Sequence, residues 1–265
     1  MKGIDVSRWQ GEINWKAVKN DGIDFAIIKA GGSDDGFYKD SRFEENYKNA
    51  KEAGLSVGSY YFVGPGCVSS TDGAADAKRF LDIIKGKQFD MPVYIDIETT
   101  PPALKREATD AVIAFCEALE KAGYYVGIYA SDISGFKDRL DCDRLADYDK
   151  WVAKYGAKPI YVKSYGMWQM SSSGTVNGVK GYVDIDEAYK DYPNIIKKAC
   201  LNGYKGFSLN NSSTATKDKV YIVKSGDTLT KIATINGTTV SKLVADNKIK
   251  DPDLIYPGQK IIVKK

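Results

Sequence analysis

The stretch Met91-Pro-Val-Tyr-Ile-Asp-Ile-Glu-Thr-Thr-Pro-Pro102 predicts a buried β-strand that ends abruptly. Side chains alternate between the two faces of a strand, so Tyr94, Asp96 and Glu98 share one face. The two prolines stop the strand directly after the acids, because proline cannot donate to a neighbouring strand. The segment therefore predicts two carboxylates on one face at the C-terminal end of a strand.

Segments of the same kind recur before residue 205 and alternate with segments of helical period, a pattern typical of βα units and a largely parallel sheet. The helical segments 43–53 and 108–122 each end at a glycine, Gly54 and Gly123. The predicted strands are Gly3–Ser7, Phe25–Ala30, Ser56–Phe62, Pro92–Glu98, Tyr125–Ala130, Lys150–Tyr155, Met167–Ser171 and Tyr182–Asp186.

Eight strands of this kind favour an α/β fold with a TIM-like barrel. The last three strands lie only about 16 residues apart, which is too close for a crossover that carries a helix of ordinary length. We therefore expect the closing third of the barrel to be irregular, with antiparallel pairing as one option.

Two more acids, Asp5 and Asp184, occupy similar strand-end positions, and TIM-like barrels have their active sites at the C-terminal ends of the strands. Like charges in one cleft cannot all ionise freely, so at least one carboxyl is expected to stay protonated near neutral pH. A protonated carboxyl beside ionised ones is what glycoside hydrolysis requires. Two alternatives stay open at this point: solvated turn residues, and a site for Mg²⁺ or Ca²⁺.

Composition excludes several other classes of protein. The 265 residues contain no histidine, which excludes catalytic triads that need an imidazole and imidazole-ligated zinc or iron, and the four cysteines form no CxxC pair. We expect no cofactor and no metal. The net charge of +3 is too small to indicate nucleic-acid binding, and no apolar run is long enough to enter a membrane.

A small, polar stretch divides the chain. We predict a barrel over 1–204, a flexible linker over 205–219 and a second domain over 220–265. From Val220 onward there are 8 Lys and Arg against 4 Asp and Glu, whereas the preceding part has 30 against 31. The basic excess therefore belongs to the tail.

The first domain resembles glycoside hydrolase family 25, the lysozymes (muramidases) of the Chalaropsis type. The motifs that carry this resemblance, in chain order, are Gly3-Ile-Asp-Val-Ser-Arg-Trp-Gln-Gly11, Gly54-Leu-Ser-Val-Gly-Ser-Tyr60, Asp96-Ile-Glu98, Trp151-Val-Ala-Lys-Tyr155, Trp168-Gln169 and Val183-Asp184. The resemblance implies an irregular (β/α)5β3 barrel and cleavage of the β-1,4 bond between N-acetylmuramic acid and N-acetylglucosamine in peptidoglycan.

The resemblance also implies the roles of individual residues. Glu98 is expected to be the catalytic acid, with Asp5, Asp96 and Asp184 lining the cleft. The rings of Tyr60, Tyr129 and Trp151 lie near the predicted strand ends, where sugar faces stack on aromatic rings, and with Gln169 they are the expected substrate-binding residues. The sequence departs from the family pattern at Tyr61, where histidine is common, at Met170, where tyrosine is common, and at Asp186, where asparagine is frequent.

The tail predicts a strand, two short helices and a strand, and it resembles the LysM module, a small domain that binds glycans containing N-acetylglucosamine. Its expected glycan-binding residues are Gly226, Asp227, Thr228, Leu229 and Ile255. Peptidoglycan is the expected partner, and weak self-association through the tail is a further expectation.

We therefore expect a cell-wall lytic enzyme. The N-terminus enters patterned sequence at once, without the charged and apolar regions of a secretory signal, so we expect an endolysin that stays in the host cytoplasm until lysis. A bacterial autolysin that is exported by another route is the alternative within the same class of enzyme. A non-catalytic peptidoglycan-binding lectin is the alternative from a different functional class. Retention of configuration, with the N-acetyl group of the substrate as nucleophile oriented by Asp96, is the expected mechanism.

Overall fold

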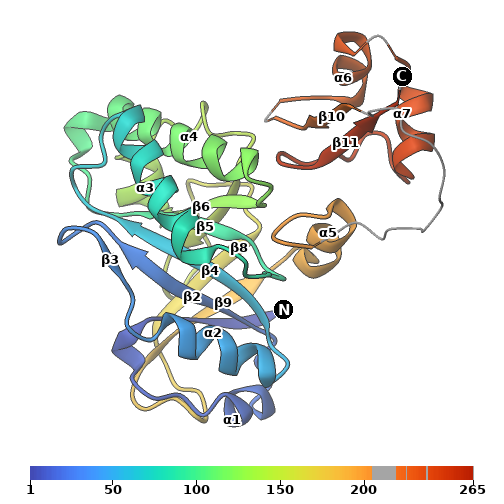
Figure 1. The fold of residues 1–265 in the computed structure, drawn as a ribbon. Helices are drawn as coiled ribbons and strands as arrows, with labels where there is room; N and C mark the ends of the chain where they lie inside the picture. Colours follow the sequence, from blue (N-terminus) through green and yellow to red (C-terminus); the bar gives the residue numbers. More distant parts are fainter. Residues whose placement is uncertain (205–218, 225, 237, 265) are drawn as a thin grey trace.

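A closed barrel dominates the first part of the chain in the computed structural model, which describes residues 1–204, 219–224, 226–236 and 238–264 (Figure 1). Within residues 1–204, one sheet has the order β1-β9-β8-β7-β6-β5-β4-β2-β3, and a further pairing of β1 with β2 closes it. The strands are β1 (Lys2–Val6), β2 (Phe25–Gly32), β3 (Tyr38–Lys39), β4 (Ser56–Val63), β5 (Val93–Ile97), β6 (Val126–Ser131), β7 (Asp149–Ala153), β8 (Met167–Gly174) and β9 (Val183–Ala188). All eight predicted strands are present, and the short hairpin strand β3 is an addition.

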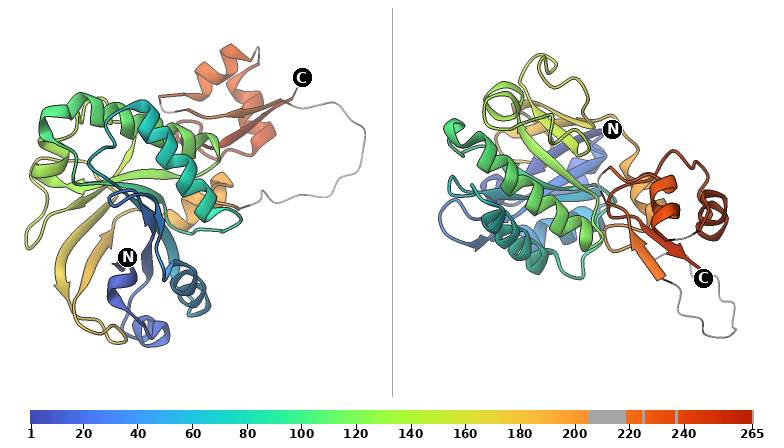
Figure 2. Two further views of the ribbon diagram at one scale, coloured as in Figure 1. Left: turned by 60° about the vertical axis from the view of Figure 1, so that its left-hand side comes forward. Right: turned by 90° about the horizontal axis from the view of Figure 1, so that it is seen from above.

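Helical segments connect the first six barrel strands and cover the outside of the sheet (Figures 1 and 2). The predicted helices are confirmed as α2 and α4. The helical segments are η1 (Arg8–Gln10), α1 (Trp15–Asn20), α2 (Phe43–Glu52), α3 (Ser70–Ile84), η2 (Pro102–Leu104), α4 (Lys105–Lys121), η3 (Asp132–Lys137, a π-helix) and α5 (Tyr192–Ala199).

The strand directions change where the barrel closes. Among the described residues, the pairs β1–β2, β2–β4, β4–β5, β5–β6, β6–β7 and β7–β8 are parallel, whereas β8–β9 and β9–β1 are antiparallel. The expectation of an irregular closing third is confirmed. Residues 175–182 join β8 to β9, a connection too short for a parallel crossover, whereas the longer segment 154–166 lets β7 and β8 pair in parallel.

Two helices pack unusually closely on the outer face of the sheet. A Cβ atom added at Gly73 of α3 would lie 2.0 Å from the backbone oxygen of Ala111 in α4, so only glycine fits there. The rings of Phe80 and Phe115 stack between these helices with centroids 6.0 Å apart, and Tyr61 of β4 packs against both rings. This aromatic layer fixes both helices on strand β4, which carries part of the site.

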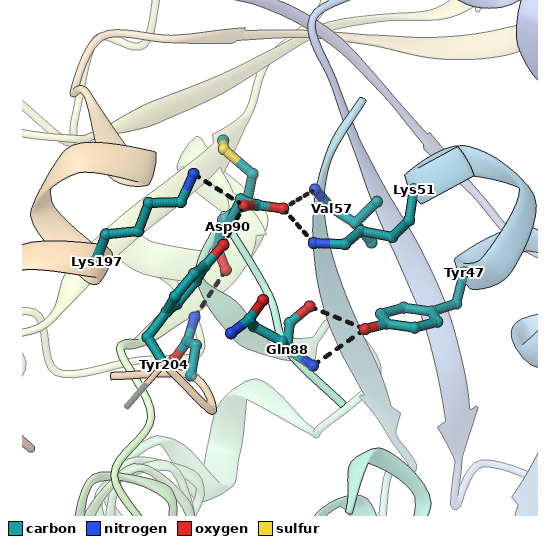
Figure 3. Close-up of polar contacts among 9 residues, drawn as sticks. Tyr47, Lys51, Val57, Gln88, Asp90, Lys197 and Tyr204 are labelled. Atoms are coloured by element: carbon teal, nitrogen blue, oxygen red, sulfur yellow. Dashed lines mark hydrogen bonds and ion pairs between the residues drawn. The ribbon is translucent and has the colours of Figure 1, made fainter. Parts of the chain in front are cut away.

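A polar cluster closes the end of the barrel from which the strands β4 and β5 begin (Figure 3). The carboxylate of Asp90 pairs with Lys51 of α2 at 2.7 Å and with Lys197 of α5 at 3.4 Å. It also accepts hydrogen bonds from the backbone N–H of Val57 and from the hydroxyl of Tyr204. Asp90 therefore joins the last described residues of the barrel domain to its first helices.

The tail forms a small domain of its own, with the strand, helix, helix, strand order that the sequence predicts. Its elements are β10 (Lys219–Ile222), α6 (Leu229–Ile235), α7 (Val240–Asn247) and β11 (Lys260–Val263), and β10 pairs antiparallel with β11. Leu229, Ile232, Leu243 and Ile261 are buried in its core. The ring of Tyr256 lies 6.0 Å from that of Tyr125 on the barrel. Of the predicted linker, residues 205–218 lie outside the described residues.

Substitution of Asp90 tests the polar cluster. Burial alone would raise the pKa of Asp90, but the hydrogen bonds from Lys51 and Tyr204 outweigh it and lower the pKa below its ordinary value. We expect Asp90→Asn to lower the free energy of unfolding by about 1–3 kcal/mol at neutral pH. An acid with a lowered pKa stabilises the fold above its unfolded-state pKa, so this difference shrinks as pH falls below about 4.

Thermal melts of wild type and variant between about pH 3 and pH 7 measure the effect. Lys197→Met is the control, since it removes only the longer, half-exposed ion pair and is expected to cost at most about 1 kcal/mol. An Asp90→Asn effect of the same size at both ends of the pH range would contradict the role given to the charge.

Candidate active site

One pocket at the mouth of the barrel contains every residue that the sequence assigns to catalysis or to substrate binding in the first domain. Its cavity volume is about 210 Å³. The expected residues in its wall are Asp5, Asp96, Glu98, Asp184, Tyr60, Tyr129, Trp151 and Gln169. The wall also includes Ser7, Trp9, Lys29, Phe62 and Tyr155. The four carboxyl groups therefore do converge on a single cleft.

The strands bring the acids together from opposite directions. Asp96 lies on β5 and Glu98 directly follows that strand, so both reach the mouth from a C-terminal end, as predicted. Asp184 is the second residue of β9 and pairs with Asp5 of β1. The sequence-based placement of Asp184 at a C-terminal strand end is wrong. Because β9 runs antiparallel to β1, its first residues face the same mouth.

Burial differs among the acids. The side chains of Asp5 and Asp96 are almost fully enclosed, with residue exposures of 5% and 4%, whereas Glu98 is exposed. One oxygen of Asp96, Oδ1, is buried without a hydrogen-bond partner among the described residues. Glu98 is therefore the acid that a bound molecule meets first, and Asp96 lies behind it.

Gln169 of β8 orients Asp5. Its Nε2 donates to Oδ2 of Asp5 at 2.7 Å. Its Oε1 accepts from the hydroxyl of Tyr129 at 2.9 Å and from that of Tyr155 at 3.2 Å. These three bonds leave Gln169 one N–H for a ligand. The residue expected to bind substrate thus acts mainly on the protein side of the pocket.

The pocket raises the pKa values of its carboxyl groups. Burial, followed by the charges of Asp186 and Asp184, raises the pKa of Asp5 well above its ordinary value. Burial and then the charge of Glu98 raise the pKa of Asp184 to about 6. Burial and the charge of Glu98 likewise raise the pKa of Asp96, and desolvation by the pocket wall raises that of Glu98. The site therefore retains protons at a pH where free carboxylic acids have lost them.

A lysine opposes this effect. The ammonium of Lys29 on β2 lies 4.4 Å from the ring centroid of Phe62 and within 6 Å of the rings of Tyr38 and Tyr60. Its charge lowers the pKa values of both Asp96 and Glu98, so it limits the rise that burial causes. Lys29 was not predicted from the sequence, although a single cation within the apolar run 25–30 was a usable signal.

An exposed aromatic side chain lies at the rim. Trp9 on η1 is 78% exposed, and the guanidinium of Arg8 lies 5.0 Å from its ring centroid. The hydroxyl of Ser7 accepts from the backbone N–H of Trp9, and Oε1 of Gln10 accepts from the backbone N–H of Ser7, so the two side chains cap the N-terminal end of this short turn and fix it beside Asp5. The site thus combines acids, one cation and aromatic rings. Among the described residues, no group of His, Cys, Asp and Glu has the arrangement to hold a metal ion.

Comparison with known protein families shows which family the chain belongs to. The sequence profile described as glycosyl hydrolases family 25 matches residues 4–179, which is more than half of the chain. The chain belongs to glycosyl hydrolase family 25. A LysM domain profile matches residues 221–264.

Individual family 25 relatives are similar over the barrel. The autolytic lysozyme of Clostridium acetobutylicum is 34% identical over 188 residues, which cover 71% of this chain and 55% of the relative. Lysozyme M1 of Streptomyces globisporus is 34% identical over 203 residues, which cover 69% of this chain and 66% of the relative. The crystal structure of the CTP1L endolysin superposes with a TM-score of 0.64 at 29% identity, covering 74% of this chain and 69% of that one. The match thus spans about half to two thirds of the two curated relatives.

In the tail of this family 25 protein, the expected glycan-binding residues lie on the loop before α6, at the first residue of α6 and on the loop before β11. Gly226 has a φ of 73°, and Thr228 Oγ1 accepts from the backbone N–H of Lys231 in α6. The side chain of Asp227 pairs with Lys231 and accepts from Tyr221, and Leu229 is buried in the core.

Asp227 and Leu229 therefore fix the described part of the loop before α6, whereas Gly226 and Thr228 are exposed on it. Ile255, on the loop before β11, packs partly against the same core.

Among the described residues, no helix has the length and apolar character that a membrane span requires.

Replacement of Lys29 tests the charge balance of the family 25 site. We expect Lys29→Met to raise the pKa values of both Asp96 and Glu98, because the cation that lowers them is lost. Carboxyl carbon titrations by NMR measure both groups directly. Lys39→Met is the control, since Lys39 pairs with Glu44 away from the pocket. Unchanged midpoints for Asp96 and Glu98 in Lys29→Met would show that the ammonium does not act on them.

Proposed function

We propose that this protein is a peptidoglycan hydrolase, an N-acetylmuramidase that cleaves the β-1,4 bond between N-acetylmuramic acid and N-acetylglucosamine. The observation that carries the proposal is the convergence of four carboxyl groups on one pocket of a family 25 barrel. Relatives named autolytic lysozyme and lysozyme M1 support the reaction class.

Glu98 is the general acid in this mechanism. It lies at the open side of the pocket, where a glycosidic oxygen can reach it. Desolvation raises its pKa, so its carboxyl group stays protonated to a higher pH than that of a free glutamic acid. Protonation of the leaving oxygen contributes about 10²–10⁴-fold to the rate. The rest of the acceleration has to come from the other groups in the pocket.

The other acids act on the developing positive charge of the sugar. Glycoside hydrolysis passes through an oxocarbenium-like transition state, which nearby carboxylates stabilise. Asp5 and Asp184 face each other across β1 and β9, and Gln169 fixes Asp5 in place. Asp96, behind Glu98, is placed to orient the N-acetyl group of the substrate as the nucleophile. The configuration of the sugar is then retained.

The tail is proposed to bind glycan strands of the wall. The LysM match and the excess of Lys and Arg in residues 220–265 support this assignment, because cationic surfaces bind anionic wall polymers. An endolysin role, with the protein in the host cytoplasm before lysis and at the wall afterwards, is the biological setting we propose. The similarity to the CTP1L endolysin supports it, and the similarity to an autolytic lysozyme supports the alternative of an autolysin.

Replacement of Glu98 tests the reaction. We expect Glu98→Gln to lower the rate of wall clearing by about 10²–10⁴-fold, because the amide has no proton to donate to the leaving oxygen. The measurements are turbidity of isolated walls, new reducing ends, and the first anomer released, which is β if configuration is retained.

Glu107→Gln, an exposed change on α4, is the matched control and is expected to clear walls at the wild-type rate. A wild-type protein that binds walls but releases no reducing ends would favour the non-catalytic lectin. Release of the α-anomer first would exclude retention.

Removal of the tail tests its binding role. We expect a protein ending at residue 205 to lose retention on insoluble walls while it cleaves soluble glycan fragments at close to the full rate, because tethering raises local concentration without adding to the chemistry. Wall pull-down and fragment turnover are compared at matched protein concentration. A melting curve checks that the barrel is intact, since Tyr125 loses its contact with Tyr256. Equal loss in both assays would contradict an independent tail.

A further inference from the structure

A fifth carboxyl group lies beneath the pocket, one step deeper on β9 than Asp184. Asp184 and Asp186 are two residues apart and project from the same face of the strand. The register sets Asp184 opposite Asp5 at the mouth and Asp186 opposite Gly3, further inside the barrel. Asp186 is fully buried and is absent from the wall that the described residues form around the pocket. It therefore acts on a substrate only through its neighbours.

Asp186 fixes an aromatic wall of the pocket. Its Oδ1 accepts a hydrogen bond from Nε1 of Trp151 at 2.8 Å. The indole ring of Trp151 packs against Tyr129, with centroids 4.4 Å apart, and against Tyr94 at 5.1 Å. Trp151 and Tyr129 both line the pocket, so a displacement of Asp186 moves two of its walls.

The second oxygen of Asp186 meets no donor. Oδ2 is buried and has no hydrogen-bond partner among the described residues. Trp151, Asp184 and Asp5 are among the side chains that interact electrostatically with Asp186. Asp5 is a carboxyl like Asp186 itself, and two carboxyl groups form a hydrogen bond only when one of them has a proton.

Burial and the charge of Asp184 favour retention of that proton, whereas the hydrogen bonds that Asp186 accepts from Trp151 and Asp5 lower its pKa and only partly offset them. Asp184 on its own strand, Asp5 on β1 and Tyr94 on β5 are the titratable groups that face it. None of the ion pairs among the described residues includes Asp186. An ionised, fully buried carboxylate without a cation is costly. Burial, with the charge of Asp184, accordingly raises the pKa of Asp186 to about 8.

We propose that Asp186 is a positioning residue of this site, and that it shares one proton with Asp5. With the proton present, Asp186 binds the indole of Trp151 through one oxygen and Asp5 through the other, so the acid and the aromatic wall have a fixed relative position. Loss of the proton leaves two carboxylates in contact, and their repulsion displaces Asp5 and Trp151. The consequence for activity rests on the proposed muramidase function, whereas the shared proton itself does not.

Asp186→Asn is the decisive variant, because an asparagine side chain has the shape of the protonated acid. Its Oδ1 can accept from Trp151 and its Nδ2 can donate to Asp5, and it does not titrate. A buried acid with a raised pKa takes up a proton on folding, so wild-type stability declines as pH rises from about 4 to about 8. We therefore expect the melting temperature of the variant, measured relative to that of wild type, to increase as the pH rises over this range.

A second readout follows the contact itself. In wild type, the indole N–H resonance of Trp151, assigned with Trp151→Phe, is expected to move as the shared proton is lost, and in Asp186→Asn it is expected to stay constant. Glu187→Gln removes one negative charge from the same strand at a partly exposed position and is the matched control. Its melting temperature is expected to differ from that of wild type by an amount that does not grow with pH.

Kinetics complete the test. Asp186→Asn is expected to keep most of the wild-type turnover in acid and to extend activity to higher pH, whereas Asp186→Leu, which has no polar atom for either partner, loses about 10- to 100-fold at every pH. Parallel melting curves for wild type and Asp186→Asn between about pH 4 and pH 8 would overturn the shared proton. If wild type cleaved no glycan, the proposed function would fail, and the melting and NMR results would still decide the inference.

Discussion

The crowding of carboxyl groups in a small, partly desolvated pocket is the physical constraint on which the rest of this structure depends. Each acid raises the free energy of ionising its neighbours, so the folded protein carries protons that the unfolded chain would release. This costs stability at neutral pH, and functional sites commonly carry such a cost. The cost is reduced by Lys29 beside Asp96 and Glu98 and by Gln169 beside Asp5. The remaining protons are what an acid catalyst needs.

The mixed strand directions of the barrel make this crowding possible. In an all-parallel barrel only the C-terminal strand ends supply the mouth. Here β9 runs in reverse, so its beginning joins the C-terminal ends of β1 and β5 at the same rim. The reversal brings Asp184 directly opposite Asp5, and it also places Asp186 below them at the level of Gly3. One strand thus supplies an acid of the pocket wall and a second acid beneath it.

Much of this could be predicted from sequence, because strand alternation and strand ends are local properties. The eight barrel strands, the shared face of Asp96 and Glu98 and the order of elements in the tail all follow from periodicity and turn residues. Contacts across the barrel do not follow from it. The bonds of Gln169 to Asp5 and of Trp151 to Asp186 join residues 164 and 35 positions apart, and they depend on how the sheet curves. The position of Asp184 was wrong for the same reason, since direction in the closing strands is a tertiary property.

The cluster around Asp90 has a consequence for the modular architecture of the chain. Tyr204, the last barrel residue that the structure describes before the tail, is bonded to Asp90 at the end where β5 begins, which is the pole opposite the mouth. The covalent exit toward the tail is therefore remote from the cleft. Recombination that exchanges the LysM domain for another tail domain can act at this junction and leave the acid-lined rim untouched, so the two domains are free to evolve separately.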